Sequence, residues 1–576
     1  MKASDFIAKK LSNYTNHVFS GQGGSVVHIL DSLSRVKGVR IIPSQNEQGA
    51  SLAADAYYRS SGKIGVVIAT SGPGILNTLQ GMACSFYDSI PSLYIAGAPV
   101  TGSIKKNKKL RQLGFQEMEV MDIVKSMTKY SVRITNTKNI NYEIEKCIYM
   151  ATEGRPGPTL IDLPDDIQRM DIIEKYQKKF VSKVKKNRNI KFNKIDSFIK
   201  NSKKPLIIIG NGVKISNTSR ELFNVINRFK IPYSMTWATA DLHGANKDLD
   251  VGSFGNYATR HGNFAIQNSD LLIILGSRMN GTQIGSNPKI FAPNAKKILV
   301  DIDPAELKEE NGIKINYKIN SDLKIFMKNF HKNAKKFNID KKWYVSINYW
   351  KSRYPIITPS MHRVNNSVNP YIFFDRLSNT CKENDIIIPD ASANLVWCFQ
   401  TFKAKKNQKI FTALNHSPMG YSIAASIGAS LGSPKKKVVA IIGDGSVQMN
   451  IQEIENIKNL DLPIKIFIIN NKGYGMVKQT IDTWLNKNYV GCDAKSGLSM
   501  PNFKKVFDSY GIKTCEINNH NELSEKIEYV MNYKKPIMCD VKIDPEARII
   551  PKLKPGSPLH DMLPRLPLNE LKLEHE

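Results

Sequence analysis

The chain has 576 residues, 41% of them hydrophobic, and a formal net charge of +31. This length predicts about three or four domains, and the apolar content argues against extensive disorder. No apolar run reaches the ~18 residues that a membrane span needs, and the first residues contain no apolar signal core.

Two further features of the composition bear on location and partners. Seven cysteines occur without a Cys-x-x-Cys pair, which favours a reducing compartment, so we expect a cytoplasmic protein without a disulfide scaffold or structural zinc. The excess of lysine is typical either of a nucleic-acid-binding protein or of a Lys-rich surface. We favour the surface, because the lysines are dispersed without interleaved aromatic residues or a reader motif, and we expect neither a nucleic-acid nor a membrane partner.

Short apolar runs alternate with helical patterns along the chain, which is typical of parallel α/β units. An amphipathic helix is expected first, in MKASDFIAKKLSNY. The runs are KIGVVIATSGPG, PSLYIAGAP and GPTLIDLP, then PLIIIGNG, DLLIILGSR and KILVDID, and finally DIIIPDAS, KVVAIIGDGS, IKIFIINNKG and PIMCDVKID. Continuous Val, Ile and Leu predict strands that are buried on both faces.

Two basic, polar stretches, at about 170–196 and 335–366, separate these sets of strands. We therefore expect an α/β protein with three doubly wound parallel-sheet domains, at residues 1–170, 196–335 and 366–550. The segment 551–576 contains five prolines, which favours an extended C-terminal arm that packs on a surface.

A lone carboxylate, Asp444, stands between two glycines directly after one of these strands. A helical pattern, NIQEIENIKNL, follows it, and the next strand ends in Asn470-Asn471. In a right-handed parallel crossover both strand ends lie on one edge of the sheet, where open sheets bind ligands, so Asp444 and Asn471 should converge there. Asp444 alone could simply cap a helix, but the Asn-Asn pair at this spacing favours a cofactor site.

The residue types at this edge suit a metal and a diphosphate. Carboxylate and amide oxygens are ligands that Mg²⁺ prefers, usually together with phosphate oxygens and water. Gly443 and Gly445 allow a close backbone approach, and the region of Ser446 offers amides at a helix start.

This Gly-Asp-Gly and Asn-Asn pattern resembles that of the thiamine-diphosphate (ThDP) enzymes. The resemblance implies that Asp444, Asn471 and the backbone carbonyl of Gly473 bind Mg²⁺. The stretches SQNEQGASLAADAYYR, ATSGPGILNTLQGMACSFYDSIPSLYIAG and ATEGRPGPTLIDLPDD are similar to the acetolactate synthase branch, and the likeness runs from VFSGQGGS to GYGMVKQ. It implies a pyrimidine-binding domain at 1–170, a central domain that possibly binds FAD at 196–335, and a diphosphate- and magnesium-binding domain at 366–550.

The same resemblance implies roles for individual residues. Glu47 would hydrogen-bond a ring nitrogen of the aminopyrimidine and so promote loss of the thiazolium C2 proton; otherwise it is only a glutamate at a helix start. Met419 would wedge the cofactor into its bent shape, or is merely a core methionine. Gly24 and Gln116 are the other catalytic positions. The remaining ThDP-binding positions are Pro73, Asn77, Ser392, Asn394, Gly445, Ser446 and Met476. In the family the two ThDP-binding domains meet across a subunit interface, so a homodimer or homotetramer is expected.

The central domain contains GNGVKIS, TWAT, GSFG, GSRMNG and DIDPAEL, which are similar to flavin-binding stretches of acetolactate synthases. The resemblance implies FAD contacts at Gly210, Gly212, Arg278 and Asp301. A flavin site that has decayed would look similar, so FAD binding stays open.

Three positions depart from the synthase pattern: Asp165, Thr282 and Thr480 stand where the synthases carry Lys, Arg and Trp. A 2-oxoacid acceptor needs a cation for its carboxylate, and two candidate cations are thus missing. The segments SPLHDMLPRLPLNEL and GSRMN also resemble synthase-like ThDP proteins linked with surface-polysaccharide sugars, which attach a two-carbon acyl unit to a keto sugar.

We therefore expect a ThDP- and Mg²⁺-dependent carboligase that decarboxylates a 2-oxoacid, with pyruvate as the expected donor, and transfers the acyl anion to a carbonyl acceptor. A keto sugar nucleotide as the acceptor is one alternative, and a simple 2-oxoacid decarboxylase or oxidase is another. A basic nucleic-acid-binding protein is the competing hypothesis from a different class.

Overall fold

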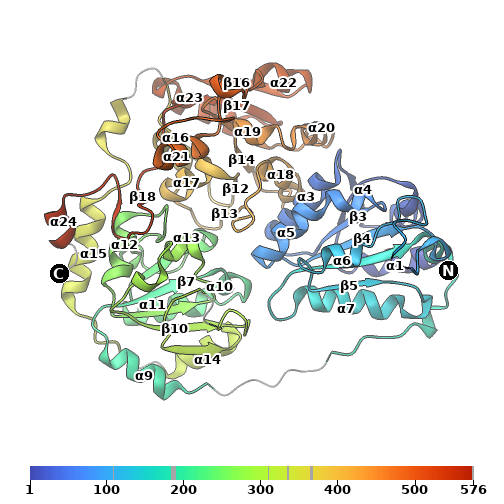
Figure 1. The fold of residues 1–576 in the computed structure, drawn as a ribbon, viewed down its shortest axis with the longest axis horizontal. Coiled ribbons are helices and arrows are strands. Elements are labelled where there is room, and N and C mark those ends of the chain that lie inside the picture. Colours follow the sequence, from blue (N-terminus) through green and yellow to red (C-terminus); the bar gives the residue numbers. More distant parts are fainter. Residues whose placement is uncertain (108, 183–189, 309–310, 334–335, 364–366, 574–576) are drawn as a thin grey trace.

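The computed structural model describes residues 1–107, 109–182, 190–308, 311–333, 336–363 and 367–573 (Figure 1). It contains three parallel sheets, so the predicted α/β class with three parallel-sheet domains is confirmed. The predicted boundary residues 335 and 366 and the end of the arm, 574–576, lie outside the described residues.

The first and third sheets have the same strand order. The N-terminal sheet runs β2-β1-β3-β4-β6-β5 and the C-terminal sheet runs β13-β12-β14-β15-β17-β16, which is the same sequence of crossovers. The N-terminal strands are β1 (His17–Ser20), β2 (Arg40–Pro43), β3 (Gly65–Ala69), β4 (Ser92–Ala98), β5 (Tyr130–Arg133) and β6 (Pro158–Pro164). The C-terminal strands are β12 (Ile386–Pro389), β13 (Lys409–Ile410), β14 (Val438–Gly443), β15 (Lys465–Asn470), β16 (Lys513–Ile517) and β17 (Ile537–Lys542).

The central sheet has the order β11-β10-β9-β7-β8. Its strands are β7 (Pro205–Ile209), β8 (Tyr233–Met235), β9 (Leu271–Leu275), β10 (Lys296–Asp301) and β11 (Tyr317–Asn320). Every residue of β7 and β9 is buried, as expected for continuous apolar runs in a sheet that is covered on both faces.

Each sheet separates two apolar cores, with helices on both faces. The N-terminal sheet lies between α1 (Ala3–Leu11), α2 (Val27–Ser34) and α7 (Ile140–Thr152) on one face and α3 (Glu47–Ser61) on the other. The central sheet lies between α9 (Phe192–Asn201), α11 (Ser219–Phe229) and α14 (Leu323–Asn333) and, opposite, α12 (Arg260–Asn268) and α15 (Lys341–Arg353). The C-terminal sheet lies between α16 (Pro370–Thr380), α17 (Ser392–Thr401) and α23 (Leu523–Asn532) and, opposite, α18 (Tyr421–Gly432), α20 (Ile454–Asn459) and α22 (Phe503–Ser509).

The N-terminal and C-terminal domains pack together through α3 and α18, which lie side by side in Figure 1. The backbones approach closely: a Cβ at Gly428 would lie 1.8 Å from the carbonyl oxygen of Ala53. The hydroxyl of Tyr421 donates a hydrogen bond to Asp55 at 2.6 Å across the same interface. These two helices hold corresponding places in their domains. Each directly precedes, in the chain, the strand that is third in the order of its sheet, β3 after α3 and β14 after α18.

The C-terminal arm packs on the central domain. The Leu553 amide donates to the carbonyl of Asn256 at 2.7 Å, and Leu559 is buried in the core that contains α12. The arm forms a small antiparallel pair, β18 (Lys552–Leu553) with β19 (Met562–Leu563), and then helix α24 (Leu568–Leu573), which its prolines did not predict.

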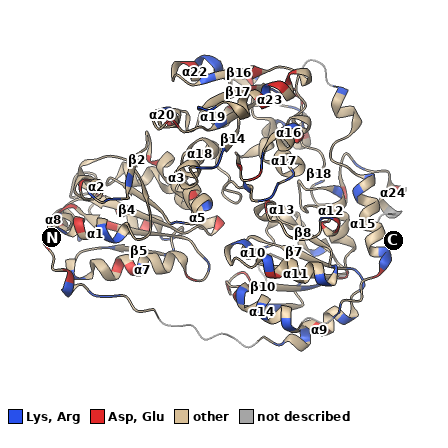
Figure 2. Cartoon of the chain, turned by 180° about the vertical axis from the view of Figure 1, so that it is seen from behind, with Lys and Arg blue, Asp and Glu red and all other residues tan. Residues whose placement is uncertain are grey.

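Figure 2 shows basic and acidic residues on elements of all three domains. Among the described residues, none of the helices combines the length and the apolar composition that a membrane crossing requires.

Candidate functional site

Two adjacent strands of the C-terminal sheet bring the predicted metal ligands to one edge. β14 and β15 are parallel neighbours, with Gly443 opposite Ile469, and Asp444 and Asn471 follow directly at their carboxyl ends. Gly473 donates its amide hydrogen to Asp444 Oδ2 at 3.0 Å. The crossover geometry therefore places these residues where the sequence predicted, at the mouth of the sheet.

Asp444 is a buried carboxylate that lacks a cationic partner among the described residues. It is 2% exposed, and burial raises its pKa to about 6 although neighbouring backbone amides donate to it. A cation at this place would relieve the cost of keeping the charge buried. The described residues contain no cluster of three or more His, Cys, Asp or Glu side chains suited to a metal. The edge instead offers one carboxylate, one amide and one carbonyl oxygen, a set that suits Mg²⁺ when phosphate oxygens complete it.

The residues around Asp444 fit a bound cofactor in part. Asn394 donates to the carbonyl of Ala391 at 2.7 Å, but its buried Oδ1 has no partner among the described residues. Such an oxygen is costly unless a ligand or a metal-bound water donates to it. Gly445 has a second reason to be glycine, because a Cβ there would lie 2.2 Å from the ring of Tyr474. Ser446 is buried beside it.

The loop of Met419 is fixed by Asp390, a residue that the sequence analysis missed. Asp390 is completely buried and accepts hydrogen bonds from the amides of Gly420 at 3.0 Å and Ser422 at 2.8 Å. Met419 directly precedes Gly420 and is half-buried. The sequence signal was the position of Asp390 directly after the apolar strand IIIP. A carboxylate at the end of a buried strand usually has hydrogen-bond partners or a ligand. Ser392 follows two residues later, with a left-handed φ of 66°.

A second group of predicted residues meets at the start of α3 in the N-terminal domain. Glu47 is the first residue of α3, and its Oε2 accepts a hydrogen bond from Asn77 Nδ2 at 3.0 Å. Asn77 ends helix α4 (Pro73–Asn77), which Pro73 begins. A Cβ at Gly21 would lie 2.3 Å from Glu47 Cγ, so glycine is needed there for the glutamate to fit.

Gly24 and Gln116 border this group. A Cβ at Gly24 would meet nothing within 4 Å, so the space in front of it is open. Gln116 has a left-handed φ of 56°, and its carbonyl oxygen would lie 2.9 Å from a Cβ at Gly72. The preceding Phe115 is 87% exposed.

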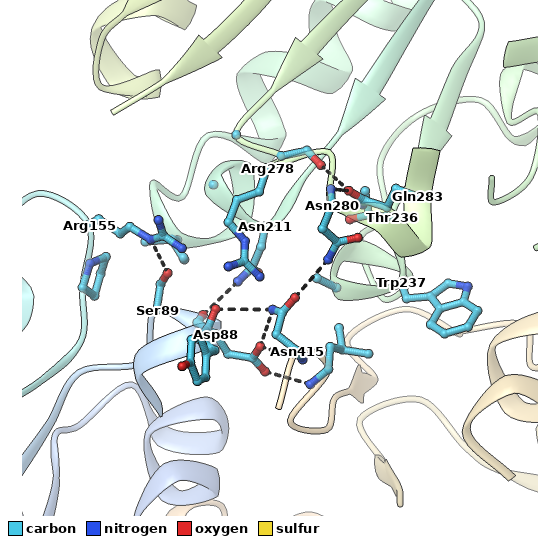
Figure 3. A pocket seen from close by; sticks show the side chains of 18 of the residues that line it. Asp88, Ser89, Arg155, Asn211, Thr236, Trp237, Arg278, Asn280, Gln283 and Asn415 are labelled. Carbon is cyan, nitrogen blue, oxygen red and sulfur yellow. Dashed lines mark hydrogen bonds between the residues drawn. The ribbon is translucent and has the colours of Figure 1, made fainter. Parts of the chain in front are cut away.

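A cavity of about 610 Å³ lies where the three domains meet (Figure 3). Its walls bring together several predicted residues, namely Gly212, Arg278, Asp301, Thr282, Ser392 and Met476. Asn415 of the C-terminal domain joins the walls, since it accepts from Asn280 at 3.2 Å and its amide donates to Asp88 at 3.1 Å. The volume is that of a site for a large organic ligand.

Arg278 is the side chain in this cavity that is best suited to bind an anion. Figure 3 shows its side chain extending from the central domain toward Asp88. Burial and the neighbouring Arg155 lower its pKa, and no carboxylate of the described residues lies within ion-pair distance of it. Arg155 is instead paired with Asp303 at 3.0 Å and Glu306 at 2.6 Å.

The predicted flavin glycines have a packing role that the sequence did not reveal. A Cβ at Gly210 would lie 2.3 Å from the carbonyl oxygen of Gly276, and one at Gly212 would lie 2.8 Å from the Cα of Gly276. Both glycines therefore allow the loops after β7 and β9 to touch. Asp301, at the end of β10, lines the cavity, and burial raises its pKa to about 6.

The three positions that depart from the synthase pattern belong to three different domains. Asp165 begins helix α8 (Asp165–Arg169) in the N-terminal domain, and its carboxylate pairs with Arg169 at 2.8 Å and lies 3.6 Å from His28 Nε2. Thr282 lines the central cavity. Thr480, on α21 (Gly475–Trp484), is exposed and donates to the carbonyl of Met476 at 3.0 Å.

Comparisons with known proteins agree with this arrangement. Residues 1–124, 192–330 and 390–541 match the models of the thiamine pyrophosphate enzyme N-terminal TPP-binding domain, central domain and C-terminal TPP-binding domain. The acetolactate synthase large subunit of Porphyra purpurea is 31% identical over 94% of this chain and 91% of its own length. The large subunit of Cyanidium caldarium is 30% identical over 95% and 94%, and that of Buchnera aphidicola is 29% identical over 98% of both chains. The chain therefore belongs to the thiamine-diphosphate-dependent enzymes of the acetolactate synthase type.

Proposed function

We propose that this protein is a Mg²⁺- and ThDP-dependent carboligase that decarboxylates a 2-oxoacid and transfers its acyl group to a carbonyl acceptor. The observation that carries the proposal is the contact between Asp444 and Gly473 at the mouth of two adjacent strands. Asp444, Asn471 and the carbonyl of Gly473 would hold Mg²⁺ there, and the metal would neutralise the diphosphate.

The chain's own residues orient the cofactor and handle the proton. Bound ThDP supplies a thiazolium carbon that accepts the electron pair released by decarboxylation. Glu47 would share a proton with the aminopyrimidine ring, and Asn77 orients the Glu47 carboxylate by donating a hydrogen bond to it. Asp390 holds the loop directly after Met419 through the amides of Gly420 and Ser422, so this side chain would press on the cofactor from a fixed position.

We further propose that two copies of the chain complete each site. Large apolar side chains are exposed near both groups of site residues. Leu113 (57%) and Phe115 (87%) lie in the segment of Gln116, and Leu76 (41%) directly precedes Asn77, the partner of Glu47. Met449 (45%), Trp484 (65%) and Leu485 (58%) lie in segments next to Asp444 and Met476. Pairing the first surface with the second surface of another copy would cover both and place Glu47 against the cofactor of the other copy. Light scattering that gives a dimer or tetramer supports this arrangement, and a stable active monomer contradicts it.

FAD is the ligand that we propose for the central cavity. Arg278 forms no ion pair with the described residues and so offers a cation for a diphosphate, and Asp301 stands at a strand end as acidic residues that bind a ribose do. Gly210 and Gly212 pack against Gly276, which is reason enough for glycine at both positions. The two glycines are therefore weaker support for FAD binding than Arg278 and Asp301. The test is the flavin absorption of the purified protein and of an Arg278→Gln variant, which should retain less flavin than the wild type.

The acceptor that we favour is a neutral ketone or aldehyde, such as a keto sugar nucleotide, over a second 2-oxoacid. Thr282 and Thr480 provide hydroxyl groups rather than cations. Asp165 repels a carboxylate less than its charge alone predicts, because Arg169 already pairs with it. The preference for a neutral acceptor therefore depends on the missing cations. Ordinary acetolactate formation is the competing outcome, as is simple decarboxylation or oxidation.

The experiment that tests this function uses purified protein with ThDP, Mg²⁺ and isotopically labelled pyruvate. Pyruvate is supplied alone and then with a panel of 2-oxoacids, aldehydes and keto sugar nucleotides, and the products are identified by NMR. Label in a carboligation product that needs a neutral acceptor supports the proposal. Acetolactate at an undiminished rate, with no gain from any neutral carbonyl, contradicts the acceptor, and no pyruvate turnover at all contradicts the donor.

We also propose a cytoplasmic location. The seven cysteines are all unpaired in the structure, as is usual for proteins of a reducing compartment.

A further inference from the structure

Glu453 is a buried carboxylate that connects the C-terminal domain to the start of α3. Its side chain is fully shielded from solvent, and it accepts hydrogen bonds from the backbone amide of Asn46 at 3.0 Å and from Asn456 Nδ2 at 2.8 Å. A Cβ at Gly49 would lie 2.4 Å from Glu453 Oε1. The carboxylate therefore reaches the first turn of α3 only because residue 49 is glycine.

The residue that Glu453 contacts is directly joined to Glu47. Asn46 is the N-cap of α3, and its side chain accepts a hydrogen bond from the amide of Gln48 at 2.8 Å. The backbone of Asn46 thus donates to Glu453 while its side chain caps the helix. Glu47 lies between Asn46 and Gln48, whose backbone amides are both held by hydrogen bonds. The contact with Glu453 therefore helps to fix the backbone position from which the Glu47 side chain extends.

The same domain contacts the opposite end of α3 through a base. Lys409 Nζ donates to the carbonyls of Arg59 at 3.1 Å and Ser60 at 2.7 Å. An acid at the N-terminus and a base at the C-terminus both complement the helix dipole. Since α3 has 15 residues, the two contacts are separated by roughly 20 Å, and only the contact of Glu453 is next to Glu47.

A buried carboxylate is an expensive way to hold two domains together. Removing such a group from water costs several kcal/mol unless hydrogen bonds compensate, and neutral apolar residues usually pack an interface at less cost. Burial raises the pKa of Glu453, although the amide donors oppose this. Glu453 binds the amide of Asn46, the residue directly before Glu47. A carboxylate at this place can therefore orient Glu47, which an apolar side chain could not do.

We propose that Glu453 is a positioning residue for Glu47: by accepting the amide hydrogen of Asn46, it fixes the first turn of α3 so that the Glu47 carboxylate meets the cofactor ring. The proposal rests on the function proposed above for Glu47. Glu453 makes no contact with the reacting atoms in this assignment, and it acts only through the backbone.

The test compares Glu453→Ala, Glu453→Gln and Lys409→Met with the wild type. Three quantities are measured: ThDP affinity by calorimetry, hydrogen–deuterium exchange at C2 of bound ThDP, and deuterium uptake by the backbone amides at the start of α3 without cofactor. Glu453→Ala should bind ThDP normally, expose the Asn46 amide to deuterium, and slow C2 exchange by roughly tenfold to a hundredfold. Glu453→Gln keeps an acceptor oxygen for Asn46 and should recover most of the rate.

Lys409→Met is the matched control, because it removes a charged contact between the same domain and the far end of the same helix. It should lower the melting temperature and leave C2 exchange unchanged. Wild-type C2 exchange in Glu453→Ala, an equal loss in Lys409→Met, or no recovery in Glu453→Gln would each overturn the proposal. If Glu453→Ala does not fold, Glu453→Asp, which keeps the charge but is one methylene shorter, should fold and exchange more slowly than the wild type; an undiminished rate overturns the proposal. Unchanged exchange in Glu47→Gln would instead reject the proposed role of Glu47 itself.

Discussion

Gly428 is the position at which a single methyl group should do most damage to the contact between the two ThDP-binding domains. In Gly428→Ala the new Cβ would lie 1.8 Å from the Ala53 carbonyl oxygen and 2.6 Å from its carbon, far inside the 3.4 Å at which ordinary van der Waals contact begins. Both opposing atoms belong to the backbone of α3, so no side chain can turn away. The helices must separate.

The cost of this separation can be bounded. Overpacking typically costs about 1–3 kcal/mol, and a rigid backbone partner puts Gly428→Ala at the upper end. Replacing a helical glycine by alanine returns about 1 kcal/mol of helix propensity. The net loss is therefore about 2 kcal/mol, which corresponds to a melting temperature lower by roughly 4–8 °C for a domain of 150–250 residues.

The assay is differential scanning calorimetry of the cofactor-free protein, with Gly281→Ala as the matched control. Gly281 is also helical, in α13 (Gly281–Ile284), but a Cβ there meets nothing within 4 Å. The control should be neutral or slightly stabilised. A melting temperature of Gly428→Ala at or above the wild-type value would refute the reasoning.

Three other outcomes are expected. Glu47→Gln should fold and bind ThDP, but slow C2 exchange of the bound cofactor by about a hundredfold or more, as loss of an acid–base group does; exchange at the wild-type rate would contradict its role. Arg278→Gln should lose flavin while its ThDP affinity stays unchanged, and equal flavin content in both proteins would remove Arg278 from the site. Burial lowers the pKa of His261 to about 4, so its contribution to stability is present above pH 6.5 and is lost as the pH falls toward 4, up to about 3 kcal/mol. His261→Gln should flatten this part of the stability–pH curve, measured by urea unfolding, and an unaltered slope would contradict the assignment.

The long apolar runs were the most predictable part of the fold. All ten became strands, because Val, Ile and Leu without alternation are stable only between two layers of helices. Shorter strands escaped prediction: β2 is largely exposed, with only Ile42 buried, and β13 has two residues. The pattern NIQEIENIKNL was correctly taken as helical, but a 3₁₀ turn at Ile451–Glu453 precedes α20.

The site was predictable where it depends on local chain geometry. The approach of Asp444 to the end of the next strand follows from the handedness of one crossover and needs only neighbouring sequence. The contact of Glu453 with Asn46 joins residues that are 407 positions apart, and no local pattern encodes it. The same holds for the close approach of Gly210 to Gly276, because the loops after β7 and β9 that it joins are far apart in the sequence.

Calorimetric titration of ThDP into the wild type and Asp444→Ala, with and without Mg²⁺, tests the central claim most directly. The wild type should bind ThDP only when Mg²⁺ is present, and Asp444→Ala should bind at least about a hundredfold more weakly, because a direct metal ligand is lost. Equal affinity in the two proteins, or binding by the wild type that ignores Mg²⁺, would contradict the assignment of this edge of the sheet as the cofactor site.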